Sequence, residues 1–187
     1  MGTIVNLTPN RPKIVEAILF LIGEAQAIGV ELSQYDIVKS LFEADGAHLN
    51  AYGRPVTFDN YAALEHGPVA RESYDMLKPS YNWQELGLAV APWTARETGP
   101  KTKAFAATRP ADLRLLSKTD QRVLQEAMQL VIKLGFKGVR ERTHEHPAWK
   151  KAWESGTARS KPMDYALMFA EPDEEAVEHL AYASART

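Results

Sequence analysis

The stretch "KIVEAILFLIGEAQAIG", residues 13–29, decides the fold, because it would be apolar on nearly every side of a helix. Asn10 and Pro12 precede it and are typical of a helix start, whereas Gly29 is typical of a helix end. A helix that is apolar all round is buried. The sequence therefore predicts a central helix against which the other elements pack.

Polar residues distinguish this stretch from a membrane span. Glu16, Glu24 and Gln26 interrupt it, and its unbroken apolar part, residues 17–22, is far shorter than the roughly 20 residues that a span needs. It also lacks the charged start and the small-residue cleavage site of a signal peptide. We expect a buried helix and no membrane partner.

Two longer helices are predicted from their first turns. Ser33 stands three residues ahead of Asp36 at the start of "LSQYDIVKSLFEADGAHLNAYG" (32–53), a pattern like a capping box, and Gly53 marks the end. Ser117 and Asp120 repeat this spacing and open the clearest amphipathic helix. The residues expected on the inner face of that helix are Val123, Leu124, Ala127, Met128 and Val131. Gly135 is expected near its end.

Shorter elements follow in the last third of the chain. Pro147 initiates a helical turn that carries Trp149 and Trp153. The segment "KPMDYALMF" (161–169) predicts a short helix, and Pro172 with Asp173 predicts the cap of a last acidic helix over residues 173–184.

The strand signals are fewer. Residues 88–94 and 103–108 flank the turn-prone Thr98-Gly99-Pro100 and predict a two-stranded hairpin. Gly67-Pro68 predicts a corner from which residues 69–77 leave as a helix, and residues 61–65 predict a short helical turn. The fold class expected is mainly α: a single compact helical domain over residues 1–187, with a core of about 10–170 and a small two-stranded β-hairpin.

Composition limits the function. Lys and Arg number 22 against 24 Asp and Glu, so the net charge is -2, and nucleic acid is an unlikely partner. The absence of cysteine excludes disulfides, thiolate nucleophiles and Cys-ligated zinc. A reducing cytoplasm is the expected location.

The densest group of polar residues is "THEHPAW", with His144, Glu145 and His146. Zinc sites commonly use two histidines four apart on a helix, whereas these are two apart and Pro147 follows. The competing interpretation is that Thr143 caps the next turn and His144 occupies a polar core position. No phosphate-binding loop and no Gly-x-Ser-x-Gly motif is present. We expect neither an enzyme nor a cofactor, with a metal-dependent hydrolase using His144, Glu145 and His146 as the alternative.

The basic "RER" of Arg140–Arg142 and the following "WKKAW" (149–153) together offer basic residues interleaved with aromatic ones, a mixture that single-stranded nucleic acid can use. Acidic neighbours favour a solvated face instead. Protein interfaces draw much of their affinity from tryptophan and arginine. The residues tentatively assigned to partner binding are Trp83, Trp93, Arg140, Trp149 and Trp153.

Four separated segments resemble one family in the same order. They are "LFEADGAHLNAYGRPV" (41–56), "YAALEHGPVARESYDML" (61–77), "LSKTDQRVLQEAM" (116–128) and "THEHPAWKKAW" (143–153). Together they resemble the Panacea domain of the SocA-like antitoxins over roughly residues 14–170. Leu64 departs from the tryptophan that the family often carries before its Gly-Pro, and "GVRERTH" is more basic than usual. The positions that carry the resemblance are His48, Tyr52, Gly53, Arg54, Pro55, Gly67, Pro68, Val69, Tyr74, Thr143, His144 and Trp149.

The resemblance implies a protein that binds and neutralises a cognate protein toxin encoded beside it. A SocA-like antitoxin can also act as an adaptor that delivers its toxin to a Clp-type protease. Many antitoxins bind their own promoter, so a DNA-binding autoregulator is a further alternative. The sequence leaves open the identity of the toxin, the interface and any homo-oligomer.

Overall fold

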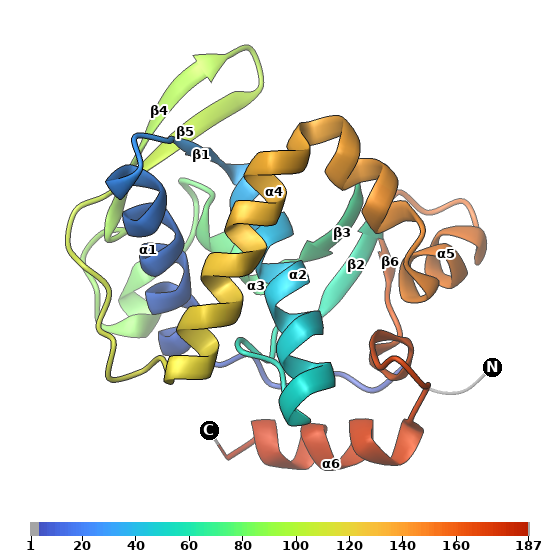
Figure 1. The fold of residues 1–187 in the computed structure, drawn as a ribbon. Helices are drawn as coiled ribbons and strands as arrows, with labels where there is room; N and C mark the ends of the chain where they lie inside the picture. Colours follow the sequence, from blue (N-terminus) through green and yellow to red (C-terminus); the bar gives the residue numbers. More distant parts are fainter. Residues whose placement is uncertain (1–3, 187) are drawn as a thin grey trace.

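A computed structural model describes residues 4–186 and shows helices packed around two small antiparallel sheets (Figure 1). The α-helices are α1 (Arg11–Ala27), α2 (Gln34–Tyr52), α3 (Arg71–Met76), α4 (Lys118–His144), α5 (Pro147–Glu154) and α6 (Glu174–Ser184). Two short 3-10 helices are η1 (Trp83–Leu86) and η2 (Tyr165–Met168). The strands are β1 (Leu32–Ser33), β2 (Tyr61–Leu64), β3 (Gly67–Ala70), β4 (Trp93–Gly99), β5 (Thr102–Ala107) and β6 (Lys161–Pro162).

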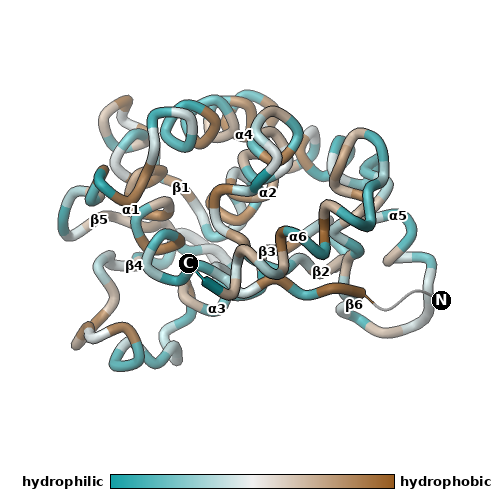
Figure 2. The backbone as a smooth tube through the Cα atoms, turned by 90° about the horizontal axis from the view of Figure 1, so that it is seen from below, coloured by the Kyte–Doolittle hydropathy of each residue, from teal (hydrophilic) through white to brown (hydrophobic). Residues whose placement is uncertain are grey.

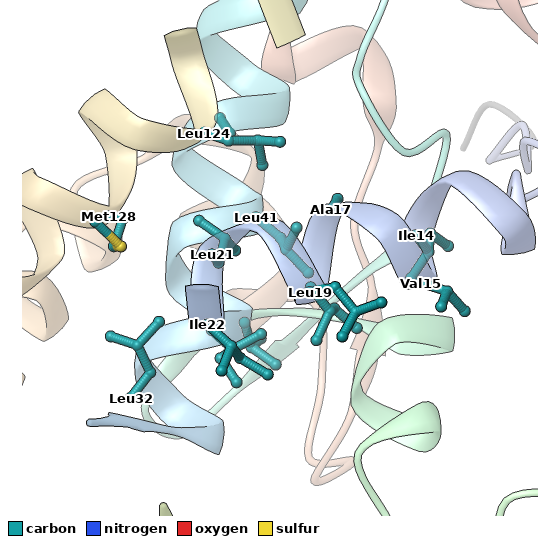
Figure 3. Packing of buried hydrophobic residues seen from close by; sticks show 14 of the residues in the cluster. Ile14, Val15, Ala17, Leu19, Leu21, Ile22, Leu32, Leu41, Leu124 and Met128 are labelled. Carbon is teal, nitrogen blue, oxygen red and sulfur yellow. The ribbon is translucent and has the colours of Figure 1, made fainter. Parts of the chain in front are cut away.

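The predicted central helix is confirmed as α1. Asn10 caps it by accepting a hydrogen bond from the Lys13 N–H, and Pro12 lies in its first turn. Ile14 and Leu21 are completely buried. Figure 3 shows Leu21 and Leu41 close to Leu124 and Met128, so side chains of α1, α2 and α4 meet in one core. Within residues 4–186, no helix is long and apolar enough to cross a membrane.

Both predicted capping boxes are present. Ser33 accepts from the Asp36 N–H and Ser117 from the Asp120 N–H, and each aspartate accepts from the backbone of its serine in return. All five residues of the expected inner stripe of α4 are buried, and hydrophilic and hydrophobic positions alternate along this helix (Figure 2). Gly135 interrupts the helix where its end was expected: its φ of 64° and ψ of 179° are not helical, and a second helical segment continues beyond this kink to His144.

The expectation of one two-stranded hairpin is wrong. Six strands form two three-stranded antiparallel sheets, in the orders β1-β5-β4 and β3-β2-β6. The predicted hairpin is real as β4 and β5, although β4 begins only at Trp93. The other four strands are two to four residues long. Such runs are too short to show the alternation of polar and apolar residues that reveals a strand. The prediction of a mainly helical fold is roughly right, but the predicted amount of sheet is too small.

Gly67-Pro68 is a strand start and not a helix corner. Residues 61–65, expected as a helical turn, contain β2, which pairs with β3 from Leu64↔Gly67 to Tyr61↔Ala70. Gly67 follows the two-residue turn Glu65-His66 with a φ of 99°, a conformation that favours glycine. Pro68 is tolerated because β3 is an edge strand. The helix predicted over residues 69–77 begins only at Arg71, where Asp59 accepts from the Glu72 and Ser73 N–H groups.

The structure after α4 differs in part from the prediction. Thr143 does not cap the next turn, because its hydroxyl donates to the Val139 carbonyl within α4. His146 caps α5 instead, and its side chain accepts from the Ala148 N–H. The helix initiated by Pro147 and the acidic last helix are confirmed as α5 and α6. The short helix expected over residues 161–169 is β6 followed by η2.

Two groups of buried residues form the hydrophobic interior. The larger lies among α1, α2, α4 and the β1-β5-β4 sheet, and the smaller lies among β2, α5, η2 and α6. Helix α2 contributes to both, with Leu41 in the first and Phe42 in the second. A single domain stays a prediction.

Candidate functional site

The positions that carry the family resemblance gather in two places, and the first surrounds the carboxylate of Asp120. The Asp120 cluster consists of Lys13 from α1, His48 from α2, Arg54 from the following turn, and Asp120 from the start of α4. Lys13 Nζ lies 2.8 Å from Oδ2 of Asp120, while His48 Nε2 and an Arg54 guanidinium nitrogen each lie 3.1 Å from Oδ1. The Asp120 side chain is fully buried. This cluster joins three segments that are far apart in sequence.

The hydrogen bonds of His48 place a proton on its Nδ1. Nδ1 lies 2.7 Å from the Arg54 carbonyl, which can only accept, so Nδ1 carries the proton. Nε2 lies 3.0 Å from the Thr119 hydroxyl and 3.1 Å from Oδ1 of Asp120. Burial lowers the pKa of His48, and the hydrogen bond to the Arg54 carbonyl and the nearby Asp120 only partly offset this effect.

Asp120 is charged at neutral pH. Burial raises its pKa, but interactions with Lys13, the Ser117 N–H and Arg54 together outweigh burial and bring the pKa below its ordinary value. A cavity of about 540 Å³ lies beside Lys13 and Arg54 and is bordered by His179 of α6. Arg54 is the partly exposed member, with 35% of its side chain accessible.

The other residues of this motif build the turn after α2. Gly53 ends the helix with a φ of 73°, and Tyr52 places its ring 4.5 Å from that of His48 and accepts from Arg122. The turn continues through buried Pro55. The carboxylate of Asp45 then accepts from two successive backbone N–H groups, at Val56 and Thr57. These contacts position Arg54 against Asp120.

The second place is the Lys39 junction, which consists of Lys39 of α2, Gly67 and Pro68 of β3, and Thr143 of α4. Lys39 is 1% exposed, and its Nζ donates to the Pro68 carbonyl at 2.7 Å. Burial lowers the pKa of Lys39 to about 7. A Cβ at Gly67 would lie 2.6 Å from both Lys39 Nζ and Thr143 Oγ1. The junction therefore needs glycine at this position.

A stack of rings borders the Lys39 junction. The rings of His144 and Trp149 are parallel with centroids 3.8 Å apart, and Trp153 stacks on Trp149 at 5.4 Å. Trp149 Nε1 donates to the Leu64 carbonyl at 3.0 Å, which ties α5 to β2. Burial lowers the pKa of His144, and Arg140 and Lys39 add to the effect. The aromatic residues thus hold the β2–β3 turn against the end of α4.

His144, Glu145 and His146 do not converge. The His144 ring stacks on Trp149, the His146 ring contacts Phe42 at 5.1 Å, and Glu145 pairs with Lys150 at 2.5 Å. Across residues 4–186 there is no group of three or more His, Asp or Glu side chains that could hold a metal ion. The alternative of a metal-dependent hydrolase gains no support from this geometry.

The five residues tentatively assigned to partner binding differ in exposure. Trp83, Trp93 and Trp149 are buried, at 6% to 7% exposure, whereas Trp153 is half-buried and Arg140 is exposed. Trp83 and Trp93 pack edge to face with centroids 5.1 Å apart beside the β4–β5 hairpin. The structure therefore divides the set between that hairpin and the α4–α5 region.

Two motif positions neither belong to nor border these two clusters. Val69 is partly buried against the larger core. The Tyr74 ring lies 4.4 Å from the Lys78 ammonium.

Sequence reasoning missed the two groups that organise these clusters. Asp120 was expected only as a helix cap, and Lys39 was not expected at all. The available signal was weak: Lys39 lies between the apolar pairs Ile37-Val38 and Leu41-Phe42 of a helix whose other face is polar. A polar residue between buried positions can be buried only where a partner reaches it, and the partner here is a backbone carbonyl 29 residues away.

The fold and the two clusters define a mainly helical protein in which the motif residues His48 and Arg54 both contact the buried Asp120. Residues 37–150 match the family model described as antitoxin SocA-like, Panacea domain. The chain belongs to this family. The matched segment runs from α2 into α5 and contains both the Lys39 junction and His48, Arg54 and Asp120. No curated protein and no solved structure matches the chain.

Proposed function

We propose that this protein is an antitoxin that neutralises a cognate protein toxin by direct binding, in the cytoplasm that its lack of cysteine favours. The observation that carries the proposal is the match to the SocA-like antitoxin family over residues 37–150. Antitoxins act by binding their toxins, and exposed aromatic and arginine side chains of this chain are suited to protein binding.

The burial of the motif residues supports a role in shaping a surface. His48, Asp120, Lys39 and Thr143 are each at most 1% exposed, and the polar atoms of the first three contact neighbouring segments, whereas the Thr143 hydroxyl donates within α4. A substrate in solution does not reach such groups. They hold α2, α4 and the β2–β3 turn in fixed positions, which a rigid binding surface requires.

An exposed patch lies next to the Lys39 junction. We call it the α4 patch and define it as Tyr35, His66, Phe136 and Arg140. The Phe136 ring is 4.7 Å from that of Tyr35 and 5.5 Å from that of His66, and Phe136 is 53% exposed. Arg140 is one helical turn beyond Phe136. Aromatic and arginine side chains often dominate the affinity of protein interfaces, so we assign the α4 patch to toxin contact.

Co-expression tests the proposal. The product of the open reading frame adjoining this gene is expressed from an inducible promoter, with and without this protein. We expect growth to stop without it and to recover with it, and the two proteins to co-purify in a fixed ratio. A version of this gene with an early stop codon controls for the effect of its RNA. A harmless neighbour, or growth arrest that this protein does not relieve, would contradict the antitoxin function.

The abundance of the toxin separates two modes of neutralisation. If the antitoxin only covers the toxin, toxin levels stay constant while growth recovers. If it acts as an adaptor for a Clp-type protease, toxin levels fall when it is present and recover in a host that lacks the protease. Direct binding is common to both modes, and pulse-chase labelling of the toxin distinguishes them.

A further inference from the structure

Strand β4 leaves one side of its backbone without a partner. It is the outer strand of the sheet β1-β5-β4, at the upper left of Figure 1. The Thr108 N–H donates to the Pro92 carbonyl, which fixes the alternation of the β4–β5 ladder. Thr94 and Arg96 therefore direct their N–H and C=O groups to β5, and Trp93, Ala95 and Glu97 direct theirs outward. Within residues 4–186 no hydrogen bond reaches these outward groups.

A pocket lies beside this edge. It has a volume of about 640 Å³, and its lining includes Trp83, Val90, Trp93, Ala95 and Phe105. Trp93 and Ala95 belong both to the pocket lining and to the outward-facing positions of β4. Val90 contributes an apolar side chain that is 73% exposed. A strand added to β4 would direct every second side chain toward the pocket.

The charge of the pocket favours an acidic ligand. Its lining contains Lys78 and Lys103 and no carboxylate. Lys78 pairs with Asp75 at 2.6 Å. Lys103 forms no ion pair within the described residues, although Glu97 is opposite it in the β4–β5 register. A carboxylate brought by a ligand would find Lys103 available.

We propose that the edge of β4 binds an extended segment of the toxin as an additional strand. This inference rests on the proposed function. The segment carries an apolar side chain that enters the pocket beside Trp83 and Trp93, and an Asp or Glu side chain that pairs with Lys103. Backbone hydrogen bonds to Trp93, Ala95 and Glu97 supply affinity, and the pocket and Lys103 supply specificity. The β4–β5 hairpin is linked to the α4 patch by β1. This strand pairs with β5, and the helix α2 that follows it carries Tyr35 of the patch.

Hydrogen exchange provides the first test, with the purified protein and its complex with the neighbouring toxin. We expect the amides of Trp93, Ala95 and Glu97 to exchange rapidly in the free protein and to become protected in the complex. The amides of Thr94 and Arg96 serve as internal controls, because they already bond to β5. Unchanged exchange at all three outward amides in a saturated complex would overturn the inference.

Two pairs of variants test the backbone and the charge separately. Ala95→Pro removes an outward N–H without removing a bond to β5, and Ala95→Thr keeps it. Lys103→Glu reverses the charge in the pocket, and Lys101→Glu makes the same change at the hairpin tip. We expect Ala95→Pro to bind the toxin about tenfold or more weakly than Ala95→Thr, which carries a similar side-chain bulk, and Lys103→Glu to bind it about tenfold or more weakly than Lys101→Glu, the loss of one or two hydrogen bonds or one ion pair. Circular dichroism and urea unfolding check that each variant is folded. If Ala95→Pro does not fold, the comparison of Lys103→Glu with Lys101→Glu still tests the inference.

The outcomes separate this inference from the proposed function. If the wild-type protein binds and neutralises the toxin but all four variants bind equally well, the function stands and the strand docking is wrong. If the wild-type protein does not bind the toxin, both fail. If sedimentation shows a dimer of this chain that Ala95→Pro abolishes, a second copy occupies the edge and the toxin assignment is overturned.

Discussion

Nε2 of His48 and Oδ1 of Asp120 lie 3.1 Å apart, and both side chains are almost completely buried. The same carboxylate also meets Lys13 and Arg54. One negative charge therefore connects α1, the end of α2 and the start of α4. A charge without partners is costly in the protein interior, so the energetic consequence of this arrangement appears when the carboxylate is removed.

Replacement of Asp120 by asparagine is expected to destabilise the protein strongly. The variant keeps the size of the side chain but leaves Lys13 and Arg54 without their counter-charge. Removing one partner of a buried ion pair costs about 3 kcal/mol or more, and urea unfolding measures the change. Asp75→Asn is the matched control, because Asp75 pairs with Lys78 at the surface with 56% of its side chain exposed. Its cost is expected to stay below about 1 kcal/mol. Equal effects of the two variants would show that the Asp120 cluster contributes no more than a surface pair.

Lys39 predicts an alkaline pH dependence of stability. Burial lowers its pKa to about 7 in the folded protein, whereas the unfolded chain has the ordinary value near 10.5. Between these values the unfolded state binds more protons, so the free energy of unfolding rises with pH. The expected slope relative to Lys39→Met approaches about 1.4 kcal/mol per pH unit between pH 7 and pH 10. Urea unfolding of both proteins at several pH values measures this slope, and parallel curves would show that Lys39 keeps an ordinary pKa.

The helices could be predicted because their signals are local. Ser33 with Asp36 and Ser117 with Asp120 satisfy the first turns of α2 and α4, and the apolar stripe of α4 follows its own periodicity. The kink at Gly135 could not be predicted in this way, because an isolated glycine is compatible with a helix end, a kink or a continuous helix.

The strands and the site required contacts between distant residues. Tyr61–Leu64 is a strand because Gly67–Ala70 and Lys161–Pro162 pair with it on either side, and "YAAL" alone contains no alternation that reveals this. The family resemblance identified His48, Arg54, Gly67 and Thr143 as motif positions but not their neighbours. Asp120 and Lys39 become visible as centres of the two clusters only when the helices are placed together.

Alanine at Gly67 is expected to destabilise the Lys39 junction. The residue has a φ of 99°, and an added Cβ would lie 2.6 Å from Lys39 Nζ and from Thr143 Oγ1. Backbone strain and overpacking together cost about 3 kcal/mol. Gly23→Ala is the control, because Gly23 is exposed in α1 and nothing lies within 4 Å of the added methyl group. That change is expected to stabilise the protein by about 0.5–1 kcal/mol, since alanine favours a helix. Thermal unfolding of both variants checks the opposite signs, and two equal shifts would contradict the close packing at Gly67.

Charge reversal at Arg140 is expected to weaken toxin binding without changing stability. Its guanidinium is exposed and makes no hydrogen bond or ion pair with the residues that the structure describes, so no folded-state contact is lost. An arginine beside the exposed Phe136 can instead pair with an acidic group of the toxin, and its loss costs about tenfold or more in affinity. Arg159→Glu, in the exposed loop between α5 and β6, makes the same charge change away from the α4 patch. Calorimetric titration with the toxin and urea unfolding measure the two quantities separately. If Arg140→Glu and Arg159→Glu bind the toxin equally well, the α4 patch is not a contact surface, because a general charge effect would act on both variants alike.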